Sequence, residues 1–544
     1  MADELLLNIR GLKVEARGEA GWTEIVHGVD LDLKRGEILG LIGESGSGKS
    51  TIGLAAMGFA RDGCRISGGA VTFDGVELTT ASDAERRALR GSRIAYVAQS
   101  AAASFNPSLK LIDQCTEVAT VHGKMDRRLA QSASIDLFKR LHLPKPAEIG
   151  FRYPHQLSGG QLQRAMTAMA MVCRPELIVF DEPTTALDVT TQIEVLAAIR
   201  EVVRQFGTSA IYITHDLAVV AQMADRVKVL LKGEEVEEAP TRTMLATPKE
   251  DYTRSLWAVR SLRAEAKPAT VPRAVPILAV DRVSASYGAI SVLDDVSFAL
   301  HPGRTLAVVG ESGSGKSTTA RVITGLLPPT RGEVRLDGEV LPASYRQRSK
   351  EQLRRIQFIY QMADTALNPT QTIRDILGRP IEFYLGVRGK EKEERIRALL
   401  RSIELEPDKY IDRLPRELSG GQKQRIGIAR ALAAEPQVVI CDEVTSALDQ
   451  LVTEGILKLL LDLQKRLGLS YVFITHDLAT VEAIADEVVV MQRGRVVEAA
   501  AKADLFRPPH HPYTELLLSS VPQMDPDWLD RLLAERAANE GAPT

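Results

Sequence analysis

Two stretches of this sequence have the residue types and the spacing that bind a phosphate group. GESGSGKST occupies residues 43–51 and returns without change at 310–318. In the pattern G-x-x-x-x-G-K-[ST], the glycines let successive backbone N–H groups turn toward an anion, the lysine supplies charge, and the hydroxyl can reach Mg²⁺. Two identical copies make a chance match negligible, so nucleotide binding is predicted. The residues concerned are Gly43, Ser45, Gly46, Gly48, Lys49, Ser50 and Thr51, and Gly310, Ser312, Gly313, Gly315, Lys316, Ser317 and Thr318.

The segments on either side of the first copy predict the elements that position it. The apolar run at 36–43 predicts a buried strand, and the run at 51–60 predicts a helix. A strand, a glycine-rich turn and a helix N-terminus together present N–H groups and a helix dipole to an anion. Residues 5–35 alternate apolar and polar positions, which predicts antiparallel strands ahead of the loop.

Acidic and histidine side chains follow further apolar runs. An acidic pair comes directly after LIVF and again after VVIC, and a histidine ends the later patterns IYIT and VFIT. An aspartate at such a strand end can help to hold Mg²⁺, and the next carboxylate can orient an attacking water. Either feature alone is more often structural, so the prediction depends on their ordered repetition. The residues are Asp181, Glu182 and His215, and Asp442, Glu443 and His476.

The same order of motifs occurs in both halves of the chain. Each half has a glutamine after a strand pattern, then LSGGQ, which could also serve as a helix N-cap, then the acidic pair and the histidine. The lysines of the two phosphate loops lie 267 positions apart, and equivalent residues from LSGGQ onward lie 261 apart. This constant offset indicates a duplicated domain. The additional residues are Gln99, Ser158, Gly159, Gly160 and Gln161, and Gln361, Ser419, Gly420, Gly421 and Gln422.

Composition limits the alternatives. The 544 residues carry a net charge of −3, which argues against nucleic acid as the main partner. The four cysteines show no C-x-x-C spacing, so no zinc or iron–sulfur site is expected and a reducing cytoplasmic compartment fits. The N-terminus has no signal-peptide pattern, and no run approaches the roughly 18 apolar residues of a membrane span. A membrane role therefore requires a partner that supplies the spans.

In this order, the motifs resemble those of ATP-binding cassette (ABC) ATPases with two nucleotide-binding domains in one chain. The resemblance implies an α/β fold with two tandem P-loop NTPase domains, each having a RecA-like core, an antiparallel β subdomain and a helical subdomain. It implies ATP and Mg²⁺ as ligands. The resemblance assigns the role of catalytic base to Glu182 and Glu443 and the role of γ-phosphate sensor to His215 and His476. It implies that Gln99 and Gln361 link Mg²⁺ and water with the membrane partner. The metal ligands that it implies are Ser50, Gln99, Asp181, Ser317, Gln361 and Asp442.

The family also places LSGGQ of one domain against the phosphate loop of the other, head to tail. Because every catalytic residue type is present twice, two competent sites are expected. Site one would join Lys49, Ser50, Asp181, Glu182 and His215 to Ser419–Gln422, and site two would join Lys316, Ser317, Asp442, Glu443 and His476 to Ser158–Gln161.

Some positions depart from the family pattern. Val444 stands where a proline usually follows the glutamate, so a looser turn is expected there. Tyr287 stands where the family stacks an aromatic ring on adenine, whereas the first half has Ala16 at the corresponding place. Trp22 is the candidate to replace that ring.

The segments after each cassette narrow the subfamily and set the expected boundaries. RPPHHPYTELLLSSVP (507–522) resembles the C-terminal extension of oligopeptide, dipeptide and nickel importer ATPases, and 247–262 is a weaker copy. Packing is favoured over metal binding for His510 and His511. The expected boundaries are 1–262 for the first domain with its extension, 263–276 for an Ala/Pro-rich linker, 277–506 for the second domain, and 507–544 for the second extension with a tail that frays after Asp525.

The predicted function is the ATP-hydrolysing subunit of a bacterial ABC importer for peptides or peptide-like solutes. It would lie peripherally on the cytoplasmic face of the membrane, bound to two transmembrane permease subunits and, through them, to a periplasmic or extracellular solute-binding protein. The alternative is a soluble tandem cassette protein that acts on ribosomes, although such proteins carry a long charged linker. The cargo (dipeptide, oligopeptide, glutathione, opine, microcin or metal chelate) cannot be read from this chain, because the binding protein and the permeases select it.

Overall fold

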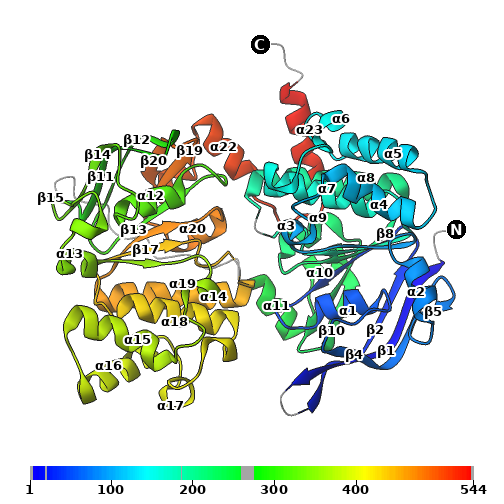
Figure 1. Cartoon of the computed structure of the whole chain (residues 1–544), viewed down its shortest axis with the longest axis horizontal. Helices are drawn as coiled ribbons and strands as arrows, with labels where there is room; N and C mark the ends of the chain where they lie inside the picture. The colour runs from blue at the N-terminus through cyan, green and yellow to red at the C-terminus, as the bar shows by residue number, and fades with distance from the viewer. Residues whose placement is uncertain (1–3, 19–20, 186, 259–274, 447, 541–544) are drawn as a thin grey trace. The chain divides into compact units, whose positions relative to one another are not determined.

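The computed structural model describes all residues except 1–3, 19–20, 186, 259–274, 447 and 541–544. The chain divides into two units, whose elements are labelled in Figure 1. The first unit comprises Met1–Leu187, Thr191–Ala258 and Pro522–Thr544, and the second comprises Asp188–Thr190 and Val259–Val521. The described residues of the two units build the same architecture.

An antiparallel four-stranded sheet contains the first strands of unit one, in the order β2-β1-β4-β5. β1 and β2 form a long hairpin, as predicted for residues 5–35, and the apolar positions on one face of the hairpin are buried. The strands are β1 (Leu5–Gly18), β2 (Gly21–Lys34), β4 (Cys64–Phe73) and β5 (Val76–Glu77).

A six-stranded sheet forms the core of unit one, in the order β10-β9-β3-β8-β7-β6, and is parallel except for the edge strand β10. Every residue of β3, β7 and β8 is buried, as expected where both faces of a parallel sheet are covered. Because β3 lies beside β8, which pairs with β7, the phosphate loop and the carboxyl ends of β7 and β8 meet at one sheet edge. The strands are β3 (Ile38–Ile42), β6 (Ile94–Val97), β7 (Leu177–Asp181), β8 (Ser209–Ile213), β9 (Arg226–Leu231) and β10 (Glu234–Pro240).

The helices of unit one follow the predicted pattern, with shifted ends. The helix after the phosphate loop stops at Ala55 rather than near residue 60, and Gly58 then turns the chain with a φ of 62°. The region 110–156 is helical, as predicted, and the next helix begins within LSGGQ. The helices are α1 (Lys49–Ala55), α2 (Asp83–Leu89), α3 (Ala101–Ser104), α4 (Leu111–Val121), α5 (Arg127–Arg140), α6 (Pro146–Ile149), α7 (Gly159–Met171), α8 (Val189–Phe206), α9 (Leu217–Met223), α10 (Thr241–Ala246) and α11 (Asp251–Ala258).

Unit two repeats these sheets, with orders β12-β11-β14-β15 and β16-β17-β18-β13-β19-β20. The predicted fold class of two α/β domains, each with a core sheet, an antiparallel sheet and a helical region, is confirmed. Its strands are β11 (Leu278–Tyr287), β12 (Ile290–Leu300), β13 (Thr305–Val309), β14 (Arg331–Leu336), β15 (Glu339–Val340), β16 (Ile356–Ile359), β17 (Val438–Asp442), β18 (Ser470–Ile474), β19 (Glu487–Gln492) and β20 (Arg495–Ala501). Its helices are α12 (Lys316–Ile323), α13 (Lys350–Arg355), α14 (Ala363–Ala366), α15 (Ile373–Pro380), α16 (Gly389–Ser402), α17 (Pro407–Tyr410), α18 (Gly420–Leu432), α19 (Gln450–Leu467), α20 (Leu478–Ile484), α21 (Lys502–Leu505) and α22 (Pro512–Ser519).

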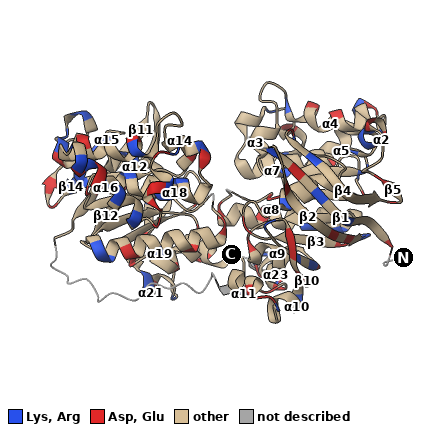
Figure 2. Ribbon diagram, turned by 90° about the horizontal axis from the view of Figure 1, so that it is seen from below, with Lys and Arg blue, Asp and Glu red and all other residues tan. Residues whose placement is uncertain are grey.

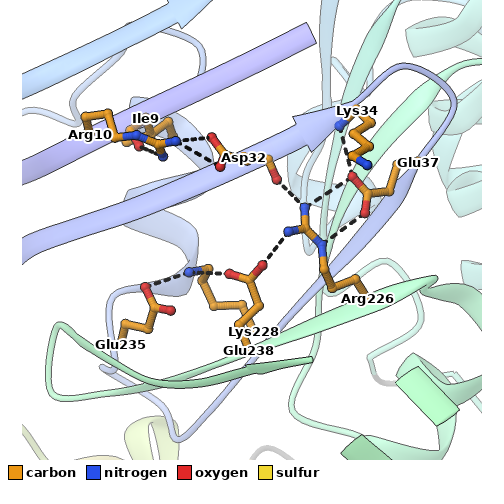
Figure 3. Close-up of polar contacts among 9 residues, drawn as sticks. All are labelled: Ile9, Arg10, Asp32, Lys34, Glu37, Arg226, Lys228, Glu235 and Glu238. Carbon is orange, nitrogen blue, oxygen red and sulfur yellow. Dashed lines mark hydrogen bonds and ion pairs between the residues drawn. The ribbon is translucent and has the colours of Figure 1, made fainter. Parts of the chain in front are cut away.

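Charged residues of both signs are interspersed along the elements of each unit (Figure 2). One group is largely buried in unit one, where β9 and β10 meet the strands that precede the phosphate loop (Figure 3). The Lys228 side chain is 2% exposed, and its ammonium group pairs with Glu235 at 2.6 Å and Glu238 at 2.5 Å. The Arg226 guanidinium forms ion pairs with both Glu238 and Glu37, and its Nε lies 3.0 Å from Glu37 Oε1. Each buried charge therefore has an opposite partner.

The end of the chain returns to unit one as helix α23 (Trp528–Glu540). Trp528 and Leu529 are buried, and Asp530 pairs with the buried guanidinium of Arg200 in α8. The side-chain N–H₂ of Gln222, in α9, donates to the carbonyls of Gln523 and Asp525 at 2.8 Å each, and its oxygen accepts from Leu529 N–H. The prediction that the tail frays after Asp525 is therefore wrong for Trp528–Glu540.

The predicted linker at 263–276 lies almost wholly outside the described residues, which resume at 275. Both histidines of the second extension make contacts within the fold. His511 caps α22, because its ring nitrogen Nδ1 accepts from Tyr513 N–H at 3.2 Å, and the His510 side chain is only 6% exposed.

Candidate functional site

The phosphate loop of each unit joins a core strand to a helix through glycines that other residues cannot replace without strain. Gly43 has a φ of 146° and Gly48 a φ of 96°, and the equivalent Gly310 and Gly315 have 150° and 105°. A Cβ atom on Gly43 would collide with the carbonyl oxygen of Leu230. The loop backbone is therefore held close to the neighbouring strand, with its N–H groups at a helix N-terminus.

The side chain of the lysine in each phosphate loop folds back onto the first two residues of that loop. Lys49 Nζ donates to the carbonyls of Gly43 at 2.7 Å and Glu44 at 2.6 Å. Lys316 Nζ makes the same contacts in unit two, both at 2.8 Å. Burial lowers the pKa of Lys316, against the raising effect of nearby carboxylates. These ammonium groups are placed where phosphate oxygens can replace the carbonyls.

A hydroxyl and a carboxylate meet beside each loop. Ser50 Oγ donates to Asp181 Oδ1 at 2.7 Å, and Ser317 Oγ donates to Asp442 Oδ1 at 3.0 Å. Burial raises the pKa of Asp442, and the nearby Glu443 adds to the rise. Two hard oxygen donors at one point suit Mg²⁺, which is usually held by few protein ligands together with phosphate oxygens. The residues present therefore fit the predicted metal.

The structure adds a residue that the sequence reading missed. Tyr96, in β6, donates its hydroxyl proton to Asp181 Oδ2 at 2.6 Å, and Phe358 stands at the equivalent position of unit two. Burial raises the pKa of Tyr96, and the contact with Asp181 adds to it. The difference was visible in the strings RIAYV and RIQFI, but only the pairing of β6 with β7 shows that it concerns Asp181.

In unit one, three of the predicted residues meet around one carboxylate. Glu182 Oε2 accepts from the side-chain amide of Gln99 at 3.0 Å, and Oε1 lies 3.1 Å from Nδ1 of His215. Thr185, which was not predicted, donates its hydroxyl proton to Oε2 at 3.0 Å. Glu182 has a φ of 49°, a left-handed conformation that is unfavourable for a non-glycine residue and is concentrated at functional sites.

Unit two repeats this arrangement. Glu443 Oε2 accepts from Gln361 at 2.6 Å, Oε1 lies 3.4 Å from Nδ1 of His476, and its φ is 48°. The looser turn expected from Val444 is not seen. Val444 is buried, and Glu443 N–H donates to the Ile474 carbonyl at 2.9 Å, as Glu182 N–H does to its own neighbouring strand.

Each glutamate and its histidine favour the charged form of the other. Burial opposes ionisation of Glu182, yet the contacts with His215 and Thr185 and the charge of Lys49 hold its pKa below the ordinary value. Burial lowers the pKa of His215, but Glu182 outweighs that effect and the net shift is upward. The pair Glu443 and His476 shows the same directions. An ionised carboxylate is the form that can accept a proton from water.

The LSGGQ segments form helix N-termini, as their alternative reading suggested. The Ser158 hydroxyl accepts from Gln161 N–H at 3.4 Å, while the Gln161 side chain accepts from Ser158 N–H at 3.2 Å. Ser419 and Gln422 form the same capping box at the start of α18. The serines and the first glycines are exposed, so this end of each helix can receive a further ligand.

The strand register supports the correspondence between Tyr287 and Ala16. Tyr287 pairs with Ile290 at the end of its hairpin, and Ala16 pairs with Thr23. Thr23 and Ile290 each lie 20 positions before the first glycine of their phosphate loop, Gly43 or Gly310. Arg321 donates to the Tyr287 hydroxyl at 2.9 Å and so fixes the ring. The first unit offers a methyl group at this place.

Trp22 does not take over the place of the missing ring. It pairs with Arg17, the neighbour of Ala16, so its side chain projects from the opposite face of the hairpin. There its ring is covered by the Arg65 guanidinium, at 4.3 Å from the ring centre.

Among the residues that the structure describes, no helix is both long and apolar enough to cross a membrane. The family described as "ABC transporter" matches residues 26–185 and 293–446, and the family described as "Oligopeptide/dipeptide transporter, C-terminal region" matches residues 497–543. The matched ranges contain both phosphate loops, both glutamines, both LSGGQ segments and both acidic pairs.

Relatives resemble the chain over nearly its full length. A protein of Pectobacterium atrosepticum named "Glutathione import ATP-binding protein GsiA" is 38% identical, with 98% of this chain and 92% of that protein covered. A protein of the same name from Salmonella choleraesuis is 36% identical, with 96% and 91% covered. Among solved structures, cbiO1 from Clostridium perfringens shares 28% sequence identity with this chain, with a TM-score of 0.39. The match covers 42% of this chain and 90% of the cbiO1 chain.

Proposed function

The chain belongs to the ABC transporter family, and from this premise we propose that it is the ATP-hydrolysing subunit of an importer. One observation carries the proposal, and it occurs twice. In each unit a glutamate with left-handed backbone is held by a glutamine and a histidine, beside a serine–aspartate pair and a phosphate loop. The full-length relatives named for glutathione import support the direction of transport.

The chemistry assigned to this chain is phosphoryl transfer from ATP to water. The N–H groups of the loop and the ammonium groups of Lys49 and Lys316 bind and orient the phosphates, which is the largest part of catalysis for this reaction. Mg²⁺ would neutralise charge on the phosphate oxygens. The residues that would hold it are Ser50, Asp181 and Gln99 in unit one, and Ser317, Asp442 and Gln361 in unit two.

The glutamates are assigned the handling of the attacking water. Glu182 and Glu443 accept its proton, because their contacts with His215 and His476 keep them ionised. Gln99 and Gln361 hold the second carboxylate oxygen, so the carboxylate plane is fixed before water arrives. His215 and His476 are further assigned to the γ-phosphate.

Each site is proposed to be completed by the opposite cassette. The exposed helix N-termini Ser158–Gln161 and Ser419–Gln422 would each contribute N–H groups to the phosphates of the other cassette. Tyr287 would stack on adenine in one site, and Ala16 leaves the other without a ring. ATP binding would then close the cassettes, and hydrolysis would release them.

The partners proposed are two transmembrane permeases, which the chain would contact around Gln99 and Gln361 at the cytoplasmic face of the membrane. Through them it would act with an external solute-binding protein. The cargo is proposed to be a peptide or peptide-like solute such as glutathione, because of the names of the relatives and the match at 497–543. Nothing supports the ribosomal alternative. The domain boundaries expected from the sequence remain part of the proposal, with α23, at the end of the stretch 507–544, packed within unit one.

The test is purification of the tagged chain from detergent-solubilised membranes, followed by identification of its partners and an uptake assay in vesicles. We expect two polytopic membrane proteins and ATP-dependent uptake of labelled glutathione or dipeptide, which Glu182→Gln with Glu443→Gln abolishes. Ribosomal proteins as the main partners, with no polytopic protein, would overturn the importer proposal. If an otherwise active complex took up neither solute, only the proposal about the cargo would be overturned.

A further inference from the structure

The extension after each cassette contains a tyrosine that reaches the phosphate loop. Tyr252 is the second residue of α11, and Tyr513 is the second residue of α22. The Tyr252 hydroxyl accepts a hydrogen bond from Glu44 N–H at 3.3 Å, and the Tyr513 hydroxyl accepts one from Glu311 N–H at 2.9 Å. Because Glu44 and Glu311 are the second residues of the two phosphate loops, each extension contacts the nucleotide site of its own unit.

The same glutamates are held from their other side by the lysines of the loops. The Glu44 carbonyl accepts from Lys49 Nζ, and the Glu311 carbonyl accepts from Lys316 Nζ. Each glutamate backbone is thus fixed at its N–H by a tyrosine and at its carbonyl by a lysine. If phosphate oxygens took the ammonium group, the tyrosine hydroxyl would still be bonded to this end of the loop.

The beginning of each extension helix is anchored by a carboxylate of the last core strand. In unit one, Glu237 accepts from Lys249 N–H at 2.9 Å and Glu250 N–H at 3.1 Å. In unit two, Glu498 accepts from His511 N–H at 3.1 Å. Burial opposes ionisation of Glu237, but the two N–H groups keep its pKa below the ordinary value.

The helix of the second extension also packs against the strand that leads into the phosphate loop. Tyr513 and Leu517 share a hydrophobic cluster with Ala307 and Val309 of β13. Burial raises the pKa of Tyr513 to about 12, so the hydroxyl remains protonated and neutral. The residue that follows each tyrosine, Thr253 or Thr514, is fully buried, which fixes the rotation of each helix.

We propose that Tyr252 and Tyr513 are positioning residues for ATP, so that the extensions set the geometry of the phosphate loops rather than only covering the domains. The inference rests on the proposed function. Three features repeat at the constant spacing of the two halves: the strand carboxylate, the buried threonine and the tyrosine that meets the loop. A ring that served packing alone would not need its hydroxyl on the same loop N–H in both copies.

The test removes only the hydroxyl. Tyr513→Phe and Tyr252→Phe, alone and together, are compared with Tyr384→Phe, which removes a hydroxyl in the helical region of unit two. Affinity for a fluorescent ATP analogue is measured in the Glu182→Gln, Glu443→Gln background, so that hydrolysis does not interfere. KM and kcat are measured with both glutamates intact, and the thermal midpoint is measured without nucleotide.

We expect Tyr513→Phe to weaken ATP binding about two- to tenfold, the range for the loss of one hydrogen bond. Tyr252→Phe should have a smaller effect, because its contact is longer. KM should rise with the dissociation constant, while kcat at saturation and the thermal midpoint stay at the values of Tyr384→Phe. The rise in KM without a fall in thermal midpoint is what a purely structural role would not produce.

The results that would overturn the inference are distinct from those that would overturn the function. Unchanged ATP affinity in the double Phe variant, with the parent binding ATP normally, would refute the positioning role alone. A weakening that merely follows a drop in the thermal midpoint would also refute it. Failure of the parent chain to bind ATP at all would overturn both the positioning role and the proposed function.

Discussion

The hairpin β9–β10 of the first cassette and the hairpin β19–β20 of the second have the same register and opposite chemistry. The first contains the buried ammonium of Lys228 between two carboxylates (Figure 3). The second has aliphatic side chains at all three equivalent positions. The positions compared are Lys228, Glu235 and Glu238 with Val489, Val496 and Ala499.

This comparison separates the positions that are alike in the two units from those that differ. The glutamate, glutamine and histidine of the two sites agree in their contacts. The two glutamates also agree in backbone φ, although a valine replaces the proline next to one of them. Around them, the two units differ in this hairpin, at the position of Tyr287 and Ala16, and at the position of Tyr96, which contacts Asp181 in unit one only. A fully paired charge cluster and an apolar cluster can support the same backbone, provided that nothing buried is left without a partner.

The largest effect is expected from leaving the buried lysine unpaired. Glu235→Ala with Glu238→Ala should lower the free energy of unfolding of the first cassette by about 3–5 kcal/mol. The triple change Lys228→Val, Glu235→Val, Glu238→Ala, which copies the second hairpin, should cost much less. Hydrogen exchange of β9 during urea titration measures both. Equal losses in the two variants would show that the charge itself is not what matters.

The next effect tests whether the two sites remain equivalent. Glu182→Gln with Glu443→Gln should keep ATP binding and reduce hydrolysis at least about a hundredfold, roughly 2.7 kcal/mol, because the proton acceptor is lost. Each single variant should lose much of the transport-coupled activity, and the exposed Glu201→Gln serves as control. Wild-type turnover in one single variant would mean that its site is inactive despite its residues.

A smaller effect is expected on the adenine side, where the cassettes differ. Tyr287→Ala should weaken ATP binding in the second site by about fivefold or more, since stacking of a base on a ring contributes roughly 1–3 kcal/mol. Ala16→Tyr should strengthen the first site. Trp22→Ala should leave it unchanged, because that ring faces the other way; a loss of affinity there would restore Trp22 as the platform.

The smallest effect concerns pH and should be shared by both cassettes. The pKa of His215 and of His476 is raised above 6.5. Their contribution to stability is therefore fully present below about pH 6.5 and is lost as the pH rises through the raised pKa. The thermal midpoint of His215→Asn with His476→Asn should fall below wild type at about pH 6, and the gap should close by about pH 9. The exposed His142→Asn is the control, and a gap that widens with pH would contradict the pairing.

The residues that the structure gathers in each candidate site could be picked out from the sequence because their motifs are local: a loop of nine residues, an acidic pair after an apolar strand, a serine that caps a helix. What could not be predicted depends on pairing between distant segments. Tyr96 meets Asp181 only because β6 lies beside β7, and Tyr252 meets Glu44 only because α11 folds back on the sheet. Val444 was expected to loosen a turn that the Ile474 carbonyl and tight packing in fact hold.

Helix α23 packs on the first cassette but follows the second cassette in the sequence, which affects folding during synthesis. The surface formed by Arg200 and Gln222 belongs to the first cassette, but the segment that covers it is synthesised after the second cassette. Roughly 260 residues separate Ala258 from Pro522, which at about 5–20 residues per second leaves this surface uncovered for some 10–50 seconds on the ribosome. In a nascent first cassette, Arg200 and Gln222 therefore stay uncovered until the segment 522–540 has been made. A chain that terminates before Trp528 would leave the Arg200 guanidinium without its partner Asp530, even though both phosphate loops and both acidic pairs are present.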